Sequence, residues 1–235
     1  GLILSNYSRS NSLDFPGLFQ IFSLGETDRI LNGYSKRELI NFQLEGIRSL
    51  YSKATVFDRL KEICDRVGVD GEFRQKNVAV VCDSLDENIM RQFESQSYPI
   101  KSLILAKDLD DHFIDEVDYI TKFELGRRYP INYLLDMVNA FKYTNVDYVR
   151  YSCDLEAAFN YENGTPCLAD CLISVDRFTP NEIICDSLKE SEGFRIVGEQ
   201  WDRAPAGHKK ICVLVPIVGD SERLLCRCFR SLLRS

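Results

Sequence analysis

The sequence has no apolar run approaching the roughly 18 to 20 residues of a membrane-spanning helix. Its first residues, GLILSNYSRS, lack the basic region and long apolar core of a secretory signal. Positive charge is not in excess, because 29 Lys and Arg stand against 36 Asp and Glu, giving a net charge of −7 and a pI near 5.0. Binding a polyanion requires a dense cationic face, so we expect no general nucleic-acid surface. The net charge does not argue against local basic pockets. We expect a soluble protein without a membrane span.

Histidine is also scarce. The two histidines, His112 and His208, are far apart and lack ligand-like spacing, which argues against a zinc site. Cysteine, in contrast, occurs nine times, and several of these residues lie inside apolar strand or helix patterns, where Cys packs as a small hydrophobe. A disulfide framework is the alternative, but the number is odd. We interpret the cysteines as reduced thiols and expect a cytoplasmic protein.

The most informative segment is 76–111, KNVAVVCDSLDENIMRQFESQSYPIKSLILAKDLDD. It has the pattern of a buried strand, a polar turn, an amphipathic helix and a second strand, which is how a parallel strand leads into a crossover helix. Its first half begins again at residue 209, where ICVLV (211–215) aligns with VAVV (78–81). We therefore expect an α/β protein with a mostly parallel, Rossmann-like sheet flanked by helices. The second copy stops within its helix, so we expect a chain cut from a longer protein.

The residues before this unit are predicted to be mainly helical. A Ser/Asn-rich loop leads to a short strand, LFQIF, and apolar residues then recur at helical spacing from Glu26 to about Val67. Gly68 stands where a helix would end. The polar segment DGEFRQK (70–76) follows, and the periodicity changes there from helical to strand. We place a domain boundary at this segment.

The residues after the unit continue the α/β pattern. Strands are predicted at VDYITKF (117–123) and at the start of DYVRYSCDLEAAF (147–159). A helix is predicted between them, at NYLLDMVNAFKYT (132–144). NYENGTP predicts a loop, because Asn-Gly favours a turn, and CLADCLISVDRF (167–178) predicts another strand. The expected divisions are a helical part (1–70), a middle α/β domain (76–190), a linker (191–208) and the start of a further domain (209–235).

The unit at 76–111 resembles the opening of family 2 glycosyltransferases with the GT-A fold. The matching residues are VAVVCDS (78–84), FESQSYP (93–99) and SLILAKDLDD (102–111). The second copy is similar, because it keeps Pro216 after its strand and F-R-S-L-L in its helix. The resemblance implies a GT-A-like middle domain in which a nucleotide sugar binds outside the carboxyl ends of parallel strands.

The residues upstream look like the tail of a group 1 glycosyltransferase domain of the spore-maturation type. The similar stretches are LILSNYSRS, LDFPGLFQIF and GIRSLYSKATVFDRLKEICDRVGV. That group commonly has an R-x-x-x-x-x-H-T-Y-x-x-R-L pattern in its last helices. This chain has Arg48, Ala54-Thr55-Val56 and Arg59-Leu60, with Ala54 in place of the histidine.

The resemblance implies that Asp83, Ser84 and Asp108 flank the base and ribose of the nucleotide. An alternative role for Asp83 and Ser84 is to cap the following helix, and the two roles are compatible. The acidic run that begins at Asp108 contains a formal D-x-D ending at Asp110, but such runs are usually solvated.

The family's D-x-D, which holds Mn²⁺ or Mg²⁺ beside the diphosphate, is missing before the helix 132–144. ITKFELGRRYP offers only Glu124 there, so the metal ligands are unknown. Arg127 and Arg128 would instead neutralise the diphosphate, since guanidinium groups match phosphate oxygens. The alternative is that they form only a solvated turn.

Inverting transferases also need a carboxylate base that takes the proton from the acceptor hydroxyl. Asp170 and Asp176 are the candidates, unless they merely close a strand.

We therefore expect a fragment of a multidomain cytoplasmic glycosyltransferase, transferring a hexose from a nucleotide sugar to a glycan or polysaccharide acceptor. The alternative is a catalytically inactive GT-A-like scaffold or glycan-binding module that links active domains. The apolar side of the helix 221–234 should contact either missing domains or another copy of the chain, and the second alternative is a homo-oligomer.

Overall fold

The computed structural model describes residues 3–5, 18–20, 23–53, 55–69, 75–152, 154–155 and 159–197. The described residues fall into two compact units, one ending at Gln43 and the other beginning at Leu44. Most of the predicted boundary at 70–76, and all of the predicted second copy at 209–235, lie outside the described residues.

The first unit contains a small parallel pair of strands and the beginning of the helical segment. Its elements are β1 (Ile3–Ser5), β2 (Leu18–Gln20), α1 (Leu24–Gly33) and the start of α2 (Lys36–Lys53). Ser23 caps α1, because its hydroxyl oxygen accepts a hydrogen bond of 3.3 Å from the backbone N–H of Glu26. The rings of Phe19, Tyr34 and Phe42 lie 5.2 to 5.7 Å apart and form the aromatic cluster of this unit.

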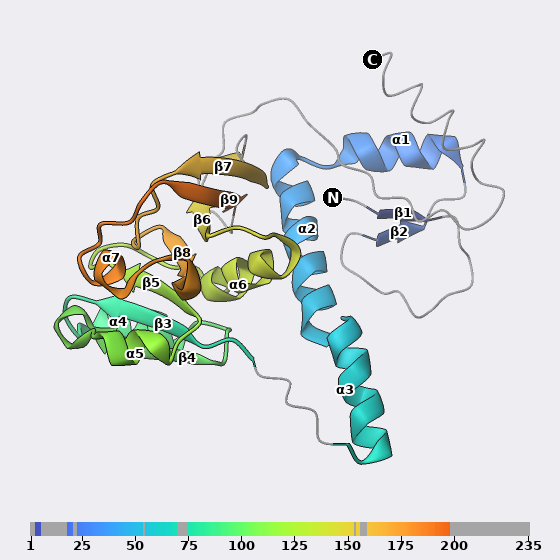
Figure 1. The fold of residues 1–235 in the computed structure, drawn as a ribbon. Helices are drawn as coiled ribbons and strands as arrows, with labels where there is room; N and C mark the ends of the chain where they lie inside the picture. Colours follow the sequence, from blue (N-terminus) through green and yellow to red (C-terminus); the bar gives the residue numbers. More distant parts are fainter. Residues whose placement is uncertain are drawn as a thin grey trace. The chain divides into compact units, whose positions relative to one another are not determined.

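The second unit is an α/β fold around a seven-stranded mixed sheet, preceded by helices (Figure 1). The strands are β3 (Val78–Cys82), β4 (Lys101–Leu105), β5 (Tyr119–Phe123), β6 (Tyr148–Ser152), β7 (Asn160–Gly164), β8 (Cys171–Ser174) and β9 (Ser191–Val197). Their order in the sheet is β4-β3-β5-β8-β6-β9-β7, with β8 and β7 antiparallel to their neighbours. The expected parallel sheet is therefore confirmed in part.

The strand-helix-strand unit predicted at 76–111 is confirmed. All five residues of β3 are buried, and β4 runs parallel to it with Val78 beside Lys101. The helix between them, α4 (Glu87–Glu94), begins at Asp86, whose carboxylate accepts a hydrogen bond of 2.8 Å from the N–H of Asn88. The capping role considered for Asp83 and Ser84 thus belongs to Asp86.

Two predictions downstream are wrong. NYENG, predicted to be a loop, is the edge strand β7, and residues 191–197 of the predicted linker form β9. β9 lies between β6 and β7, and the buried side chains of Phe194 and Ile196 secure it in the core. Pairing between distant segments therefore overrides the turn preference of Asn-Gly and the weak local periodicity.

Helices cover both faces of the sheet and create two cores. On one face, α4 and α6 (Tyr133–Tyr143) pack through Ile89, Leu134 and Met137. On the other, α5 (Asp111–Asp115) and α7 (Pro180–Ile184) pack through Ile114 and Ile183. None of the described helices is long and apolar enough to cross a membrane.

The helical segment of the second unit consists of the end of α2 and α3 (Val56–Val67). Thr55 and Asp58 form a reciprocal capping box at the start of α3. Gly68 ends the helix in the left-handed conformation, with φ 70°, as the sequence predicted.

Candidate functional site

The chain reverses its direction of travel across the sheet at β3. It moves from β3 to β4 on one side and then to β5 on the other, so β4 and β5 flank β3. In open α/β sheets, ligands bind at such a switch point, outside the carboxyl ends of the strands. The residues that follow β3 and β5 therefore define the candidate site.

Lys122, near the end of β5, binds Asp83, the first residue after β3. The Lys122 Nζ lies 2.9 Å from a carboxylate oxygen of Asp83, and this hydrogen bond raises the pKa of Lys122 above its usual value. Glu124 and Asp186 also lie close enough to Lys122 to favour its charged form. The lysine is thus a fixed positive charge at the switch point.

Arg127 lies in the turn after β5. Its Nη1 donates a hydrogen bond of 2.6 Å to the carbonyl oxygen of Ala169 and lies 3.6 Å from a carboxylate oxygen of Glu124. Burial opposes its charge, but Tyr129 and Asp170 contribute to a pKa that is raised overall. The guanidinium therefore remains a cation, and Glu124 links it electrostatically to Lys122.

Asp170 reaches the same edge because β8 runs antiparallel to β5 and begins beside its carboxyl end. The backbone N–H of Lys122 donates to the carbonyl oxygen of Leu168 at 2.8 Å, which holds this turn against β5. Asp170 lies 3.9 Å from Nη1 of Arg150 on β6. We call Asp83, Lys122, Glu124, Arg127 and Asp170 the edge cluster.

Arg150 extends this charged row along the sheet. Its Nε lies 2.9 Å from a carboxylate oxygen of Glu162 on β7, which also forms an ion pair with Arg195 on β9. The hydroxyl of Tyr148 donates to Glu162 at 3.1 Å. Cationic and anionic side chains thus alternate from β5 to β7, with Arg150 between Asp170 and Glu162.

The other predicted site residues at this edge of the sheet are exposed. Ser84 follows Asp83 and is exposed, and Asp108 is exposed in the short turn after β4. Arg128 follows Arg127 and is also exposed. Among the predicted site residues, Arg127 and Asp170 lie close enough to interact electrostatically, and Asp83 joins the edge cluster through Lys122.

Asp176 lies at the opposite edge of the sheet. It follows β8, whose last residue, Ser174, pairs with Tyr119 at the start of β5. The Ser174 hydroxyl donates a hydrogen bond of 2.5 Å to the Asp176 carboxylate. Asp176 and Asp170 were predicted as alternatives for one role, but the strand between them separates them.

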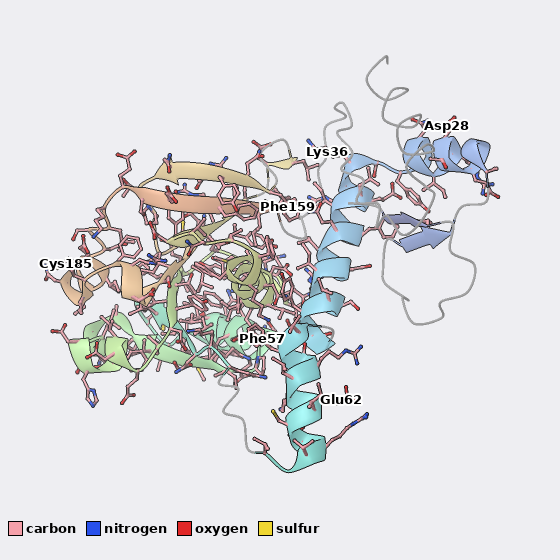
Figure 2. The ribbon with its side chains drawn as sticks, turned by 45° about the vertical axis from the view of Figure 1, so that its right-hand side comes forward. Asp28, Lys36, Phe57, Glu62, Phe159 and Cys185 are labelled. Atoms are coloured by element: carbon pink, nitrogen blue, oxygen red, sulfur yellow. The ribbon has the colours of Figure 1, made fainter. Side chains whose placement is uncertain are left out.

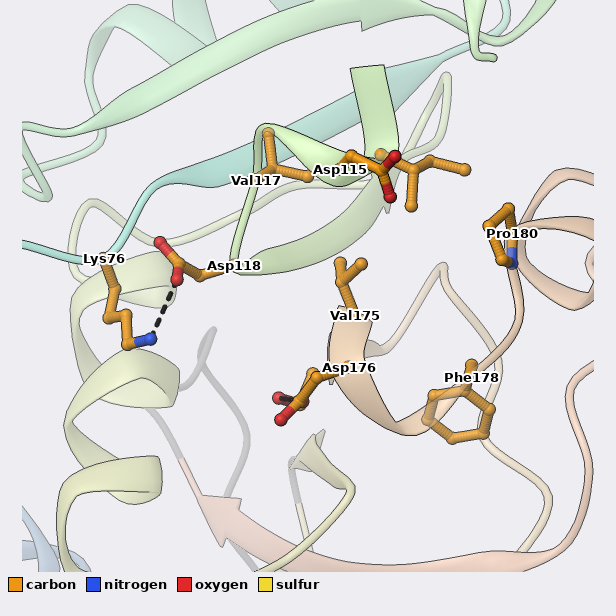
Figure 3. A pocket seen from close by; sticks show the side chains of 10 residues that line it. Lys76, Asp115, Val117, Asp118, Val175, Asp176, Phe178 and Pro180 are labelled. Atoms are coloured by element: carbon orange, nitrogen blue, oxygen red, sulfur yellow. Dashed lines mark hydrogen bonds and ion pairs between the residues drawn. The ribbon is translucent and has the colours of Figure 1, made fainter. Parts of the chain in front are cut away.

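Asp176 lines a hollow of about 360 Å³ at this amino edge (Figure 3). Asp115 and Asp118 also line it, and Lys76 Nζ donates to Asp118 at 2.8 Å. Its apolar lining includes Val117, Val175, Phe178 and Pro180. This hollow is not at the edge where the strand order reverses.

Lys122 and Arg150 were not among the site residues predicted from the sequence. Each is a cation inside a strand whose neighbours are largely apolar, ITKF and YVRYS. Burying a charged side chain in a strand costs free energy unless the charge is paired. A single cation within each largely apolar strand was therefore the feature of the sequence that could have identified these two residues.

In the part of the chain that the structure describes, no group of three or more His, Cys, Asp or Glu side chains has an arrangement that could hold a metal ion.

A scan against models of known protein families finds no match, and neither do searches of curated proteins and of solved structures.

Proposed function

We propose that the edge cluster binds the diphosphate of a nucleotide sugar, and that the second unit is a GT-A-like domain of a glycosyltransferase. The observation that supports this most is the position of Lys122 and Arg127, two cations at the carboxyl end of β5, next to the point where the strand order reverses. The motifs at 78–84, 93–99 and 102–111, which resemble family 2 glycosyltransferases, include β3, most of β4 and part of α4.

Lys122 and Arg127 take the role of neutralising the diphosphate. Charged donors make strong hydrogen bonds to phosphate oxygens, and a guanidinium can offer two parallel N–H groups. Asp83 would then exchange its bond with Lys122 for one with an N–H or O–H group of the base or ribose. Asp108, in the turn after the neighbouring strand, would flank the nucleoside.

Asp170 is the better placed of the two candidate bases, since it belongs to the edge cluster. In the proposed reaction, the acceptor hydroxyl oxygen bonds to the anomeric carbon while the bond from that carbon to the diphosphate oxygen breaks. The nucleoside diphosphate leaves and the hydroxyl proton passes to Asp170. Asp176, at the other edge, has no part in this scheme.

The alternative function is that of a catalytically inactive glycan-binding module, and a row of aromatic rings favours it. Tyr51, Tyr143, Phe194 and Tyr161 contact one another in that order, with ring centroids 5.1 to 6.0 Å apart. Tyr161 is 68% exposed and Tyr143 is also exposed. Exposed aromatic faces are suited to the apolar faces of sugar rings.

Thermal unfolding with added ligands tests the proposal. Millimolar uridine, guanosine and thymidine diphosphates are compared with the corresponding monophosphates, which lack the second phosphate. One diphosphate should raise Tm by about 3 °C or more, because ligand at 100 times Kd stabilises by about 2.7 kcal/mol. No shift with any diphosphate, together with a shift from an oligosaccharide that is lost in Tyr161→Ala, would favour the glycan-binding module instead.

A further inference from the structure

α3 exposes an apolar surface along its whole length. Val56, Phe57, Leu60, Ile63 and Val67 form this surface, which we call the apolar stripe, and they are 44 to 73% exposed. None of the described residues of α3 is buried. A helix that packs on its own domain normally turns such a stripe inward.

The helix is nevertheless well defined by its own sequence. The Thr55 hydroxyl accepts a hydrogen bond of 3.2 Å from the N–H of Asp58, and the Thr55 N–H donates one of 2.9 Å to the Asp58 carboxylate. At the other end, the N–H of Val69 donates to the carbonyl oxygen of Cys64 at 3.0 Å. The stripe is thus presented on a capped helix and not on an irregular loop.

The charges of α3 are arranged in a particular order around the stripe. At 3.6 residues per turn, its two borders are occupied by cations, and the side opposite the stripe is acidic. The border cations are Arg59 and Arg66 on one side and Lys61 on the other, and the acidic residues are Asp58, Glu62 and Asp65. Figure 2 marks Phe57 and Glu62, which belong to the apolar and polar sides.

We propose that α3 lies on an anionic lipid surface, with the apolar stripe inserted at the boundary between headgroups and acyl chains. Helices that bind in this way combine a large apolar face with cations that reach the headgroups. The border cations would meet lipid phosphates, and the acidic side would face away from the membrane, about a Debye length from its charge.

A second copy of the chain fits α3 less well. The helix has 12 residues and is therefore about 18 Å long, so two such helices bury far less than the roughly 1,200 Å² of a stable protein interface. A fluid lipid surface needs no matching contour. The ion pairs of Glu62 with Arg66, at 2.6 Å, and with Arg59, at 3.4 Å, are exposed and easily exchanged for lipid phosphates.

Cosedimentation of the whole chain with lipid vesicles tests this inference. The vesicles contain equal parts of phosphatidylglycerol and phosphatidylcholine, or phosphatidylcholine alone. We expect binding to the anionic vesicles only, weakened at high salt. Leu60→Asp should abolish it, and Arg59→Glu with Arg66→Glu should weaken it about 25-fold or more, from about fivefold for each cation.

The matched control is Met90→Asp on α4, which also places an acid at an exposed apolar position, 43% exposed. This variant should bind anionic vesicles like the wild type, and circular dichroism checks that every variant is folded. No binding to anionic vesicles, or equal binding by Leu60→Asp, would overturn the inference. Association of the protein in solution that Leu60→Asp abolishes, without vesicle binding, would also overturn it and assign the apolar stripe to a protein contact.

Discussion

Arg48 on α2 binds Asp136 on α6 through two hydrogen bonds, each 2.7 Å long, from Nε and Nη2 to the two carboxylate oxygens. The side chain of Asp136 is only 2% exposed and that of Arg48 16%. The contact joins the last turns of α2 to α6, the helix that leads from β5 to β6. A buried ion pair therefore connects the helical segment of the second unit to a helix that packs on its sheet.

Breaking this pair should destabilise the second unit. Arg48→Met leaves the Asp136 carboxylate buried without its two guanidinium bonds, so the free energy of unfolding should fall by about 3 to 5 kcal/mol. Chemical denaturation measures it. The double variant Arg48→Met with Asp136→Leu should recover most of the loss, because no buried charge remains; a double variant as unstable as the single one would contradict this explanation.

Gly193 on β9 is required by the ring of Tyr148 on β6. A methyl group on Gly193 would lie 2.7 Å from Cε1 of that ring and closer still to two other ring carbons. Gly193→Ala should therefore destabilise the protein by about 3 kcal/mol through overpacking. Gly164→Ala is the matched control, since its methyl group would lie 3.5 Å from the Tyr148 hydroxyl, an ordinary contact. Similar melting temperatures for the two variants would contradict the prediction.

Alkaline pH should weaken the fold through buried tyrosines. Burial is the main cause that raises the pKa values of Tyr98 and Tyr119 from 10.0 to about 12. Both phenols stay protonated in the folded state at pH values where the unfolded chain ionises. The contribution of these two phenols to the free energy of unfolding is therefore fully present below pH 10. It is lost as the pH rises towards 12, by about 2 kcal/mol for each residue.

Denaturation at several pH values between 9 and 12 measures this slope. Tyr98→Phe should lose about 1 kcal/mol at neutral pH, because the Tyr98 hydroxyl donates to the carbonyl oxygen of Lys76 at 2.6 Å, but its stability should fall less steeply above pH 10. A slope equal to that of the wild type would show that Tyr98 does not contribute.

The sequence predicted the local elements well where apolar periodicity was strong. VAVV became the buried strand β3, and the helix at 132–144 became α6. β7 and β9 were missed because their places depend on each other: Asn160 pairs with Arg195, and Gly164 with Ser191. No local pattern in NYENG encodes that pairing.

The site was predictable only in part, for a geometric reason. Asp83 and Arg127 follow strands that were recognised, so their shared edge followed from a parallel sheet. Asp170 and Asp176 could not be distinguished, since the antiparallel direction of β8 was unknown. The four residues of β8, Cys171–Ser174, span about 13 Å and separate Asp170 from Asp176, so the two carboxylates lie at opposite edges. Lys122 was overlooked as one polar residue within a strand.

Lys122 is the residue on which the proposed site for a nucleoside diphosphate most depends. Lys76 provides a matched control, because its Nζ lies 2.8 Å from Asp118 at the opposite edge, whereas that of Lys122 lies 2.9 Å from Asp83. Lys122→Met and Lys76→Met each remove one lysine from a lysine–aspartate pair, but only the first changes the switch point.

The most direct measurement is a calorimetric titration of the diphosphate that stabilises the protein best into the wild type and both variants, with and without manganese. We predict that Kd rises about tenfold to 100-fold in Lys122→Met, corresponding to about 1 to 3 kcal/mol, and is unchanged in Lys76→Met. Because side chains supply the positive charge, manganese should change Kd less than about twofold. Unaltered binding by Lys122→Met, or binding that requires manganese, would contradict the account.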